Sequence, residues 1–294
     1  MAARSSLKWW LHAIGGGLGL AGVLFVLLRL YSYAEQIDLS RFNITAWSII
    51  ALLALAYGSA NVLLARAWWH LLIFFEMKTD WMWAFKVYGQ SQLAKYVPGN
   101  IFHLAGRQVL GMAVGLSAQS LLKSAVWEMG LIAVAGALFG TIALPLVWAG
   151  LSLWVSLSLF AVITAALFAT TRRLLSPAVA VALIWQISFL VMSGLVFLGT
   201  LAVVVPTATL LPAFPFWGGA YVFAWLAGLF VPGSPAGMGV REMVLLLLLG
   251  GQIAQGDLLL AVVLGRGITL IGDILFFIVA SAMNMRGVDL PPKN

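Results

Sequence analysis

The sequence predicts an all-α integral membrane protein of about six transmembrane helices plus two re-entrant helical hairpins, arranged as an inverted repeat. Three observations support this fold class. Hydrophobic residues make up 63% of the 294 residues and charged residues only 9%, a composition typical of chains that cross a bilayer. Apolar stretches of about 20 residues, the length of one membrane span, recur along the chain. The tripeptide Val97-Pro98-Gly99 recurs as Val231-Pro232-Gly233 inside two further apolar stretches.

The predicted full spans follow from hydropathy in a window of about 20 residues. They lie near 11–31, 46–70, 119–142, 147–170, 177–205 and 257–283. The first span follows Arg4 and Lys8 as a secretory signal would, but no convincing small-x-small cleavage site comes after it. We therefore expect it to remain in the protein as an uncleaved span.

Two apolar stretches do not fit as simple spans. Residues 81–115 and 212–250 are each long enough for two half-crossings, and each is interrupted by Val-Pro-Gly. Proline and glycine break a helix, and lipid does not tolerate exposed backbone polar groups. Both stretches are therefore expected to be re-entrant helical hairpins, and a broken full span is the alternative.

The positions of the basic residues predict the orientation. With both termini in the cytoplasm, the basic loops obey the positive-inside rule. The residues then on the inner side are Arg4, Lys8, Lys78, Lys123, Arg172, Arg173, Arg286 and Lys293. The expected location is the cytoplasmic (inner) membrane of a bacterium or an archaeon, crossed several times.

The two Val-Pro-Gly motifs are 134 residues apart. A shift by that distance aligns two halves of a single membrane domain, 1–294, with repeat one at about 11–142 and repeat two at about 147–283. Each half reads span, span, hairpin, span, and therefore contains three full crossings. Because three is odd, the second copy is upside down relative to the first, as in many secondary transporters.

Composition argues against several classes of function. The chain has no cysteine and only three histidines, which excludes disulfides and Cys-based sites and makes a metal site unexpected. The formal net charge of +7 comes from basic residues scattered between apolar runs, so it fits membrane orientation and not nucleic-acid binding. We assign no cofactor and no catalytic residue.

The chemistry expected of the protein lies in the two interrupted stretches. Arg107 and Arg241 each follow the proline of their motif by nine residues. A half-helix that starts after Gly99 places Asn100, His103 and Arg107 close to one face, and its free backbone N–H groups attract anions. The predicted contacts to a lipid phosphate are Lys95, Asn100, His103, Arg107, Ser234, Gly237, Gly239 and Arg241.

Three acidic residues are the candidates for charge balance or proton coupling: Glu128, Glu242 and Asp273. An arginine at mid-membrane costs about 2.5–3.5 kcal/mol unless it is paired. Glu128 is therefore a candidate partner for Arg107, and Glu242 directly follows Arg241. Asp273 is expected to pair with Arg266 or with Arg66. Whether Arg107 and Arg241 bind substrate or clamp the hairpins in place stays open at this point.

The same residues resemble a known family. Lys95-Tyr96-Val97-Pro98-Gly99-Asn100 through Gly106-Arg107, and Pro232-Gly233 through Gly239-Val240-Arg241-Glu242, are similar to the two signature regions of the lysylphosphatidylglycerol synthase transmembrane region family, a flippase-like group. The resemblance covers nearly the whole chain, although Pro235 departs from it. About eleven residues follow the last span, so the soluble aminoacyltransferase domain of the bifunctional members has no counterpart. The resemblance therefore implies lipid translocation without lipid synthesis.

The expected function is that of a flippase and not an enzyme. It would move an anionic lipid, either a phospholipid or a polyprenyl-phosphate-linked glycolipid, and its partners would be the lipid head group and the surrounding lipids. A homo-oligomer or a complex with an envelope-biosynthesis enzyme is compatible with this function. One alternative is a non-transporting partner of an envelope-lipid or glycosyl-transfer enzyme. The other is an intramembrane lipid-modifying enzyme using His103, Glu128 or Asp273, although the sequence lacks a nucleophile motif for it.

Overall fold

The structure is a computed structural model, and it describes residues 42–97, 101–148, 150–205, 214–230 and 239–284. Every regular element in these ranges is a helix, which confirms the predicted all-α class. Five helices are long and apolar enough to cross a membrane. The predicted first span, 11–31, lies outside the described residues.

The five long helices agree with five of the predicted spans. They are α2 (Ile44–Phe74), α5 (Ala118–Ala143), α6 (Leu153–Leu174), α7 (Pro177–Val204) and α10 (Gln255–Ala282). A short 3-10 turn, η3 (Leu144–Leu146), extends α5. The largest difference is at α6, which starts later than the predicted 147, because the Ser152 side chain accepts a hydrogen bond from the Val155 N–H and caps the helix there.

Four of these five helices, all except α10, begin with a side-chain cap. At the start of α2, Asn43 accepts a hydrogen bond from the Ala46 N–H at 2.9 Å. Ser117 and Ser176 cap α5 and α7 in the same way, and Pro177 is the first residue of α7, a position where proline's missing N–H costs nothing. Each cap satisfies a backbone donor that apolar surroundings would otherwise leave unpaired.

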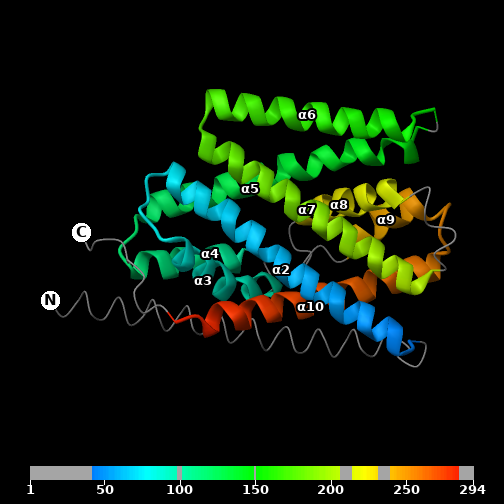
Figure 1. The fold of residues 1–294 in the computed structure, drawn as a ribbon, viewed down its shortest axis with the longest axis horizontal. Coiled ribbons are helices and arrows are strands. Elements are labelled where there is room, and N and C mark those ends of the chain that lie inside the picture. The colour runs from blue at the N-terminus through cyan, green and yellow to red at the C-terminus, as the bar shows by residue number, and fades with distance from the viewer. Residues whose placement is uncertain (1–41, 98–100, 149, 206–213, 231–238, 285–294) are drawn as a thin grey trace.

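The centre of the molecule is formed by α2, which packs along α7 and α10 (Figure 1). At the crossing of α2 and α10, Gly58 faces Gly272. A Cβ atom added to Gly58 would lie 2.8 Å from the Gly272 carbonyl oxygen. Small residues thus allow close helix approach without side chains between the backbones. In contrast, α6 lies at the edge (Figure 1), and only 6% of its most apolar 18-residue segment is buried within the protein. This is expected for a helix that faces lipid.

The two interrupted stretches each form a pair of short helices. The first stretch contains α3 (Trp81–Gln92), the 3-10 turn η2 (Leu93–Tyr96) and α4 (Phe102–Ala113). The second contains α8 (Phe214–Phe230) and α9 (Val240–Leu249). Twelve helical residues span about 18 Å, well short of a hydrocarbon core about 30 Å thick. Each helix of the first pair is therefore too short to cross the membrane alone.

The break in the first pair has a local cause. Val97 adopts an extended conformation, φ −66° and ψ 135°, because a following proline disfavours the helical region. The two pairs lie toward opposite ends of the molecule (Figure 1): α3 and α4 lie at the end where α2 finishes and α5 begins, and α8 and α9 at the end where α7 finishes and α10 begins.

Candidate functional site

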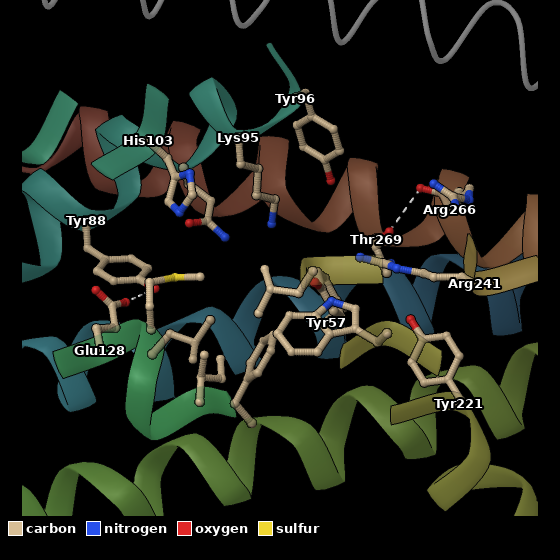
Figure 2. A pocket seen from close by; sticks show the side chains of 17 residues that line it. Tyr57, Tyr88, Lys95, Tyr96, His103, Glu128, Tyr221, Arg241, Arg266 and Thr269 are labelled. Atoms are coloured by element: carbon tan, nitrogen blue, oxygen red, sulfur yellow. Dashed lines mark hydrogen bonds between the residues drawn. The ribbon is translucent and has the colours of Figure 1, made fainter. Parts of the chain in front are cut away.

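A cavity with an empty volume of about 970 Å³, including the space at its mouth, lies where the two pairs of short helices approach each other. Both pairs contribute side chains to its wall, together with α2, α5, α7 and α10. Figure 2 shows these side chains directed toward one common space. The polar residues from the short helices and η2 are Tyr88, Gln92, Lys95, Tyr96, His103, Tyr221, Trp225 and Arg241.

Arg107 and Glu128 form a buried ion pair beside this cavity. The Arg107 Nη1 atom lies 2.6 Å from Glu128 Oε2, and the side chains are only 5% and 6% exposed. The Tyr88 hydroxyl donates to Glu128 Oε1 at 3.0 Å, and the Arg107 guanidinium lies 4.4 Å from the Tyr88 ring centroid. The predicted pairing is confirmed. Glu128 lines the cavity, whereas Arg107 is not among the lining residues, so Arg107 is placed as a clamp between α4 and α5.

Asp273 on α10 collects donors from three other segments. Its carboxylate lies 2.7 Å from the Lys95 ammonium and accepts a hydrogen bond from the Tyr96 hydroxyl. Asn61 of α2 and Gln92 of α3 donate to Oδ1 at 3.0 and 3.3 Å. Asp273 is fully buried, and these donors compensate for the loss of water. The carboxylate therefore ties the inner end of the first short-helix pair to α10 and α2.

The prediction that Asp273 pairs with Arg266 or Arg66 was wrong. Arg266 instead pairs with Glu242, whose Oε1 accepts from Nη2 at 2.7 Å and from Nε at 3.0 Å. Arg66 stacks on the Trp81 ring, with its guanidinium carbon 3.8 Å from the centroid. Glu242 likewise does not pair with Arg241, because consecutive helical residues point in different directions.

Glu242 also caps the start of α9. Its Oε2 accepts the backbone N–H of Gly239 at 2.7 Å, which caps the helix. Gly239 has φ 85°, a left-handed conformation that glycine adopts without strain. The Glu242 side chain therefore joins the first turn of α9 to Arg266 of α10.

Arg241 differs from the other cations of the site. Its side chain reaches the cavity and lies 5.8 Å from the Trp225 ring centroid. Within the described ranges no carboxylate forms an ion pair with it, and its buried Nε has no hydrogen-bond partner. A guanidinium presents a planar fork of donors that matches a phosphate. Arg241 thus presents a guanidinium without an ion-pair partner among the described residues to the cavity.

His103 is the other predicted residue that reaches the cavity with a free group. It lines the wall near Lys95 (Figure 2), and its buried Nδ1 has no hydrogen-bond partner among the described residues. Asn100, Ser234 and Gly237 lie outside the described residues. Across the described part of the chain, no three histidine, aspartate or glutamate side chains gather as metal ligands would.

Sequence reasoning missed the aromatic part of the wall. Tyr57, Phe189, Tyr221 and Trp225 line the cavity, and the Tyr57 and Phe189 rings are 5.8 Å apart. Tyr57 lies in the middle of an apolar span, away from the membrane–water interface where tyrosine usually anchors a helix. A tyrosine at that depth was the one feature of the sequence that could have indicated the aromatic wall.

Comparisons with protein-family models and with curated proteins found no match to this chain.

Proposed function

We propose that this protein is a lipid flippase that passes an anionic head group through the cavity while the acyl or prenyl chains stay in the bilayer. The observation that carries the proposal is Arg241, a cation on the cavity wall without a carboxylate partner among the described residues. A cation within a membrane segment is costly unless an anion or water compensates for it. The phosphate of a lipid would provide that compensation during transport.

The arrangement of the helices supports a transporter. In this proposal the α3–α4 and α8–α9 pairs are re-entrant hairpins that enter from opposite leaflets, with both termini in the cytoplasm. The described order α2, α3–α4, α5 corresponds to α7, α8–α9, α10, which fits two inverted repeats. Transporters of this plan bind substrate where the halves meet, and the cavity is lined from both halves.

The two motif arginines have different roles in this proposal. Arg107 holds α4 to Glu128 of α5 through a pair at 2.6 Å, and Arg241 binds the head-group phosphate. Lys95 and His103 lie on the same cavity wall and provide further donors as the head group moves. The resemblance of both motif regions to the flippase-like lysylphosphatidylglycerol synthase membrane family supports the same function.

The test is head-group translocation in liposomes that contain only this protein. Wild-type protein is expected to move a labelled anionic lipid between leaflets. Arg241→Gln removes charge-assisted hydrogen bonds worth about 1.5–3 kcal/mol, and is expected to reduce translocation at limiting lipid roughly ten- to a hundredfold. Arg172→Ala removes an exposed arginine at the end of α6 and should leave the rate unchanged.

The outcome that removes the proposal is equal flux in protein-free, wild-type and Arg241→Gln liposomes. Analysis of the recovered lipids identifies the enzymatic alternative, because an intramembrane enzyme would leave a chemically changed lipid behind.

A further inference from the structure

The charges that reach the cavity cancel in pairs, with one exception. Lys95 is neutralised by Asp273, Arg266 by Glu242 and Glu128 by Arg107, each at 2.6 or 2.7 Å. The described residues therefore leave one net positive charge, that of Arg241, when His103 is counted as neutral. Residues 98–100 and 231–238 contain no Lys, Arg, Asp or Glu, so they add no charge to this balance.

The surroundings of Arg241 are aromatic and hydroxyl-bearing. Tyr57, Tyr221 and Trp225 line the same cavity as Arg241, and Figure 2 shows Tyr57 and Tyr221 below the Arg241 side chain. Neither tyrosine hydroxyl hydrogen-bonds to another residue in the described ranges. Aromatic faces pack against the C–H faces of sugars and polyols, and phenol hydroxyls exchange hydrogen bonds with their O–H groups.

We infer that the substrate is a lipid phosphodiester with a single negative charge and an otherwise neutral, hydroxylated head group. This inference rests on the proposed function, and it narrows the substrate class. Arg241 binds the phosphodiester, and the tyrosines and Trp225 contact the polyol or sugar. Phosphatidylglycerol and a polyprenyl phosphoryl hexose share this chemistry.

The same charge balance disfavours two other kinds of lipid head group. An aminoacyl or ethanolamine head group carries an ammonium, and a free carboxylate would be its strongest partner. Glu128, Asp273 and Glu242, the carboxylates at or beside the cavity, are each held by a cation. A phosphomonoester carries nearly two negative charges, and Arg241 alone neutralises one. Like charges and unpaired buried charges disfavour both classes.

The experiment measures binding and flux separately for the purified full-length protein. Binding is the lipid-induced shift in thermal unfolding in detergent, and flux is measured in liposomes. The lipids are phosphatidylglycerol, a polyprenyl phosphoryl hexose, lysyl-phosphatidylglycerol, phosphatidylethanolamine and phosphatidic acid. At least one of the first two is expected to bind about tenfold or more tightly than each of the last three.

Variants that change the charge balance sharpen the test. Arg241→Lys keeps the charge and should keep the ranking of the lipids, whereas Arg241→Gln should abolish the preference for the phosphodiesters. Asp273→Asn leaves the Lys95 ammonium unpaired and is expected to raise the relative affinity for phosphatidic acid by about tenfold. If Asp273→Asn does not fold, the lipid preferences of Arg241→Lys and Arg241→Gln are sufficient to test the inferred substrate class.

The outcomes separate this inference from the proposed function. Tighter binding of the cationic, zwitterionic or phosphomonoester lipid overturns the inferred substrate class, even where flux is normal. Selective phosphodiester binding without flux supports the substrate class and removes the flippase function. The phosphodiester that binds more tightly shows whether the substrate is a phospholipid or a polyprenyl-linked sugar.

Discussion

The Arg107–Glu128 pair gives the sharpest test of how the short helices are held. Removal of one partner from a buried ion pair typically destabilises a protein by about 3–5 kcal/mol, because the other charge stays uncompensated. Arg107→Ala is expected near the lower end of that range, since the Tyr88 hydroxyl still donates to Glu128 at 3.0 Å. Glu128→Ala is expected to cost a similar amount. The unpaired Arg107 guanidinium would still be stabilised by cation–π contacts with the Trp68 and Tyr88 rings, whose centroids lie 5.3 and 4.4 Å away.

The double variant provides the decisive comparison. Arg107→Met combined with Glu128→Leu removes both charges and leaves apolar groups of comparable volume, so its cost is expected to be about 1–2 kcal/mol, less than either single alanine change. The measurement is unfolding in mixed detergent micelles followed by circular dichroism. Lys123→Ala, an exposed cation on the same helix as Glu128, is the control and should change stability by less than about 0.5 kcal/mol.

Additive costs would refute this reasoning. If Arg107→Met, Glu128→Leu and their combination form a matched cycle in which the two single losses add, the two side chains do not interact. If Arg107→Ala folds with wild-type stability but abolishes lipid flux, Arg107 binds substrate and is not a clamp.

Two further changes test the packing and the α9 connection by the same unfolding measurement. Gly272→Ala is expected to destabilise the protein by about 1–3 kcal/mol, because the added carbon would lie 2.8 Å from the Gly58 nitrogen; wild-type stability would contradict the close crossing of α2 and α10. Glu242→Ala is expected to cost about 2 kcal/mol, since it removes both the cap of α9 and the partner of Arg266. Met243→Ala, at a 62% exposed neighbour, is its control, and equal losses in the two variants would contradict the pairing.

The long helices were predictable because one physical requirement dominates them. A bilayer selects apolar runs of about 20 residues, and the predicted span 177–205 agrees with α7 at Pro177–Val204. The breaks were also predictable, because proline restricts the residue before it: Val97 leaves the helical region just ahead of Pro98. These features depend on local sequence and on the solvent, and not on tertiary contacts.

The pairing of the charges could be predicted only in part. Glu128 was a correct partner for Arg107 because its depth within its span suggested a common level in the membrane. Asp273 was expected to pair with Arg66 or with Arg266, which lies about two turns earlier on the same span. In the structure Arg266 pairs with Glu242 of α9, and Asp273 pairs with Lys95 of η2. Lys95 and Asp273 are far apart in the sequence. Such a contact depends on how the first helix pair packs, which periodicity does not encode.

The cost of buried charge explains why Arg241 matters more than the other cations of the cavity. Two charged residues of α10, one of each sign, form these pairs: Asp273 holds Lys95 of the first helix pair, and Arg266 holds Glu242 of the second. Both pairs of short helices are therefore attached to the same helix by ion pairs that cancel within the protein. A cation neutralised in this way gains little from a ligand, because binding would first have to break the existing pair. Arg241 has no such pair to break within the described residues, so in the proposed function an incoming phosphate would gain the full interaction there.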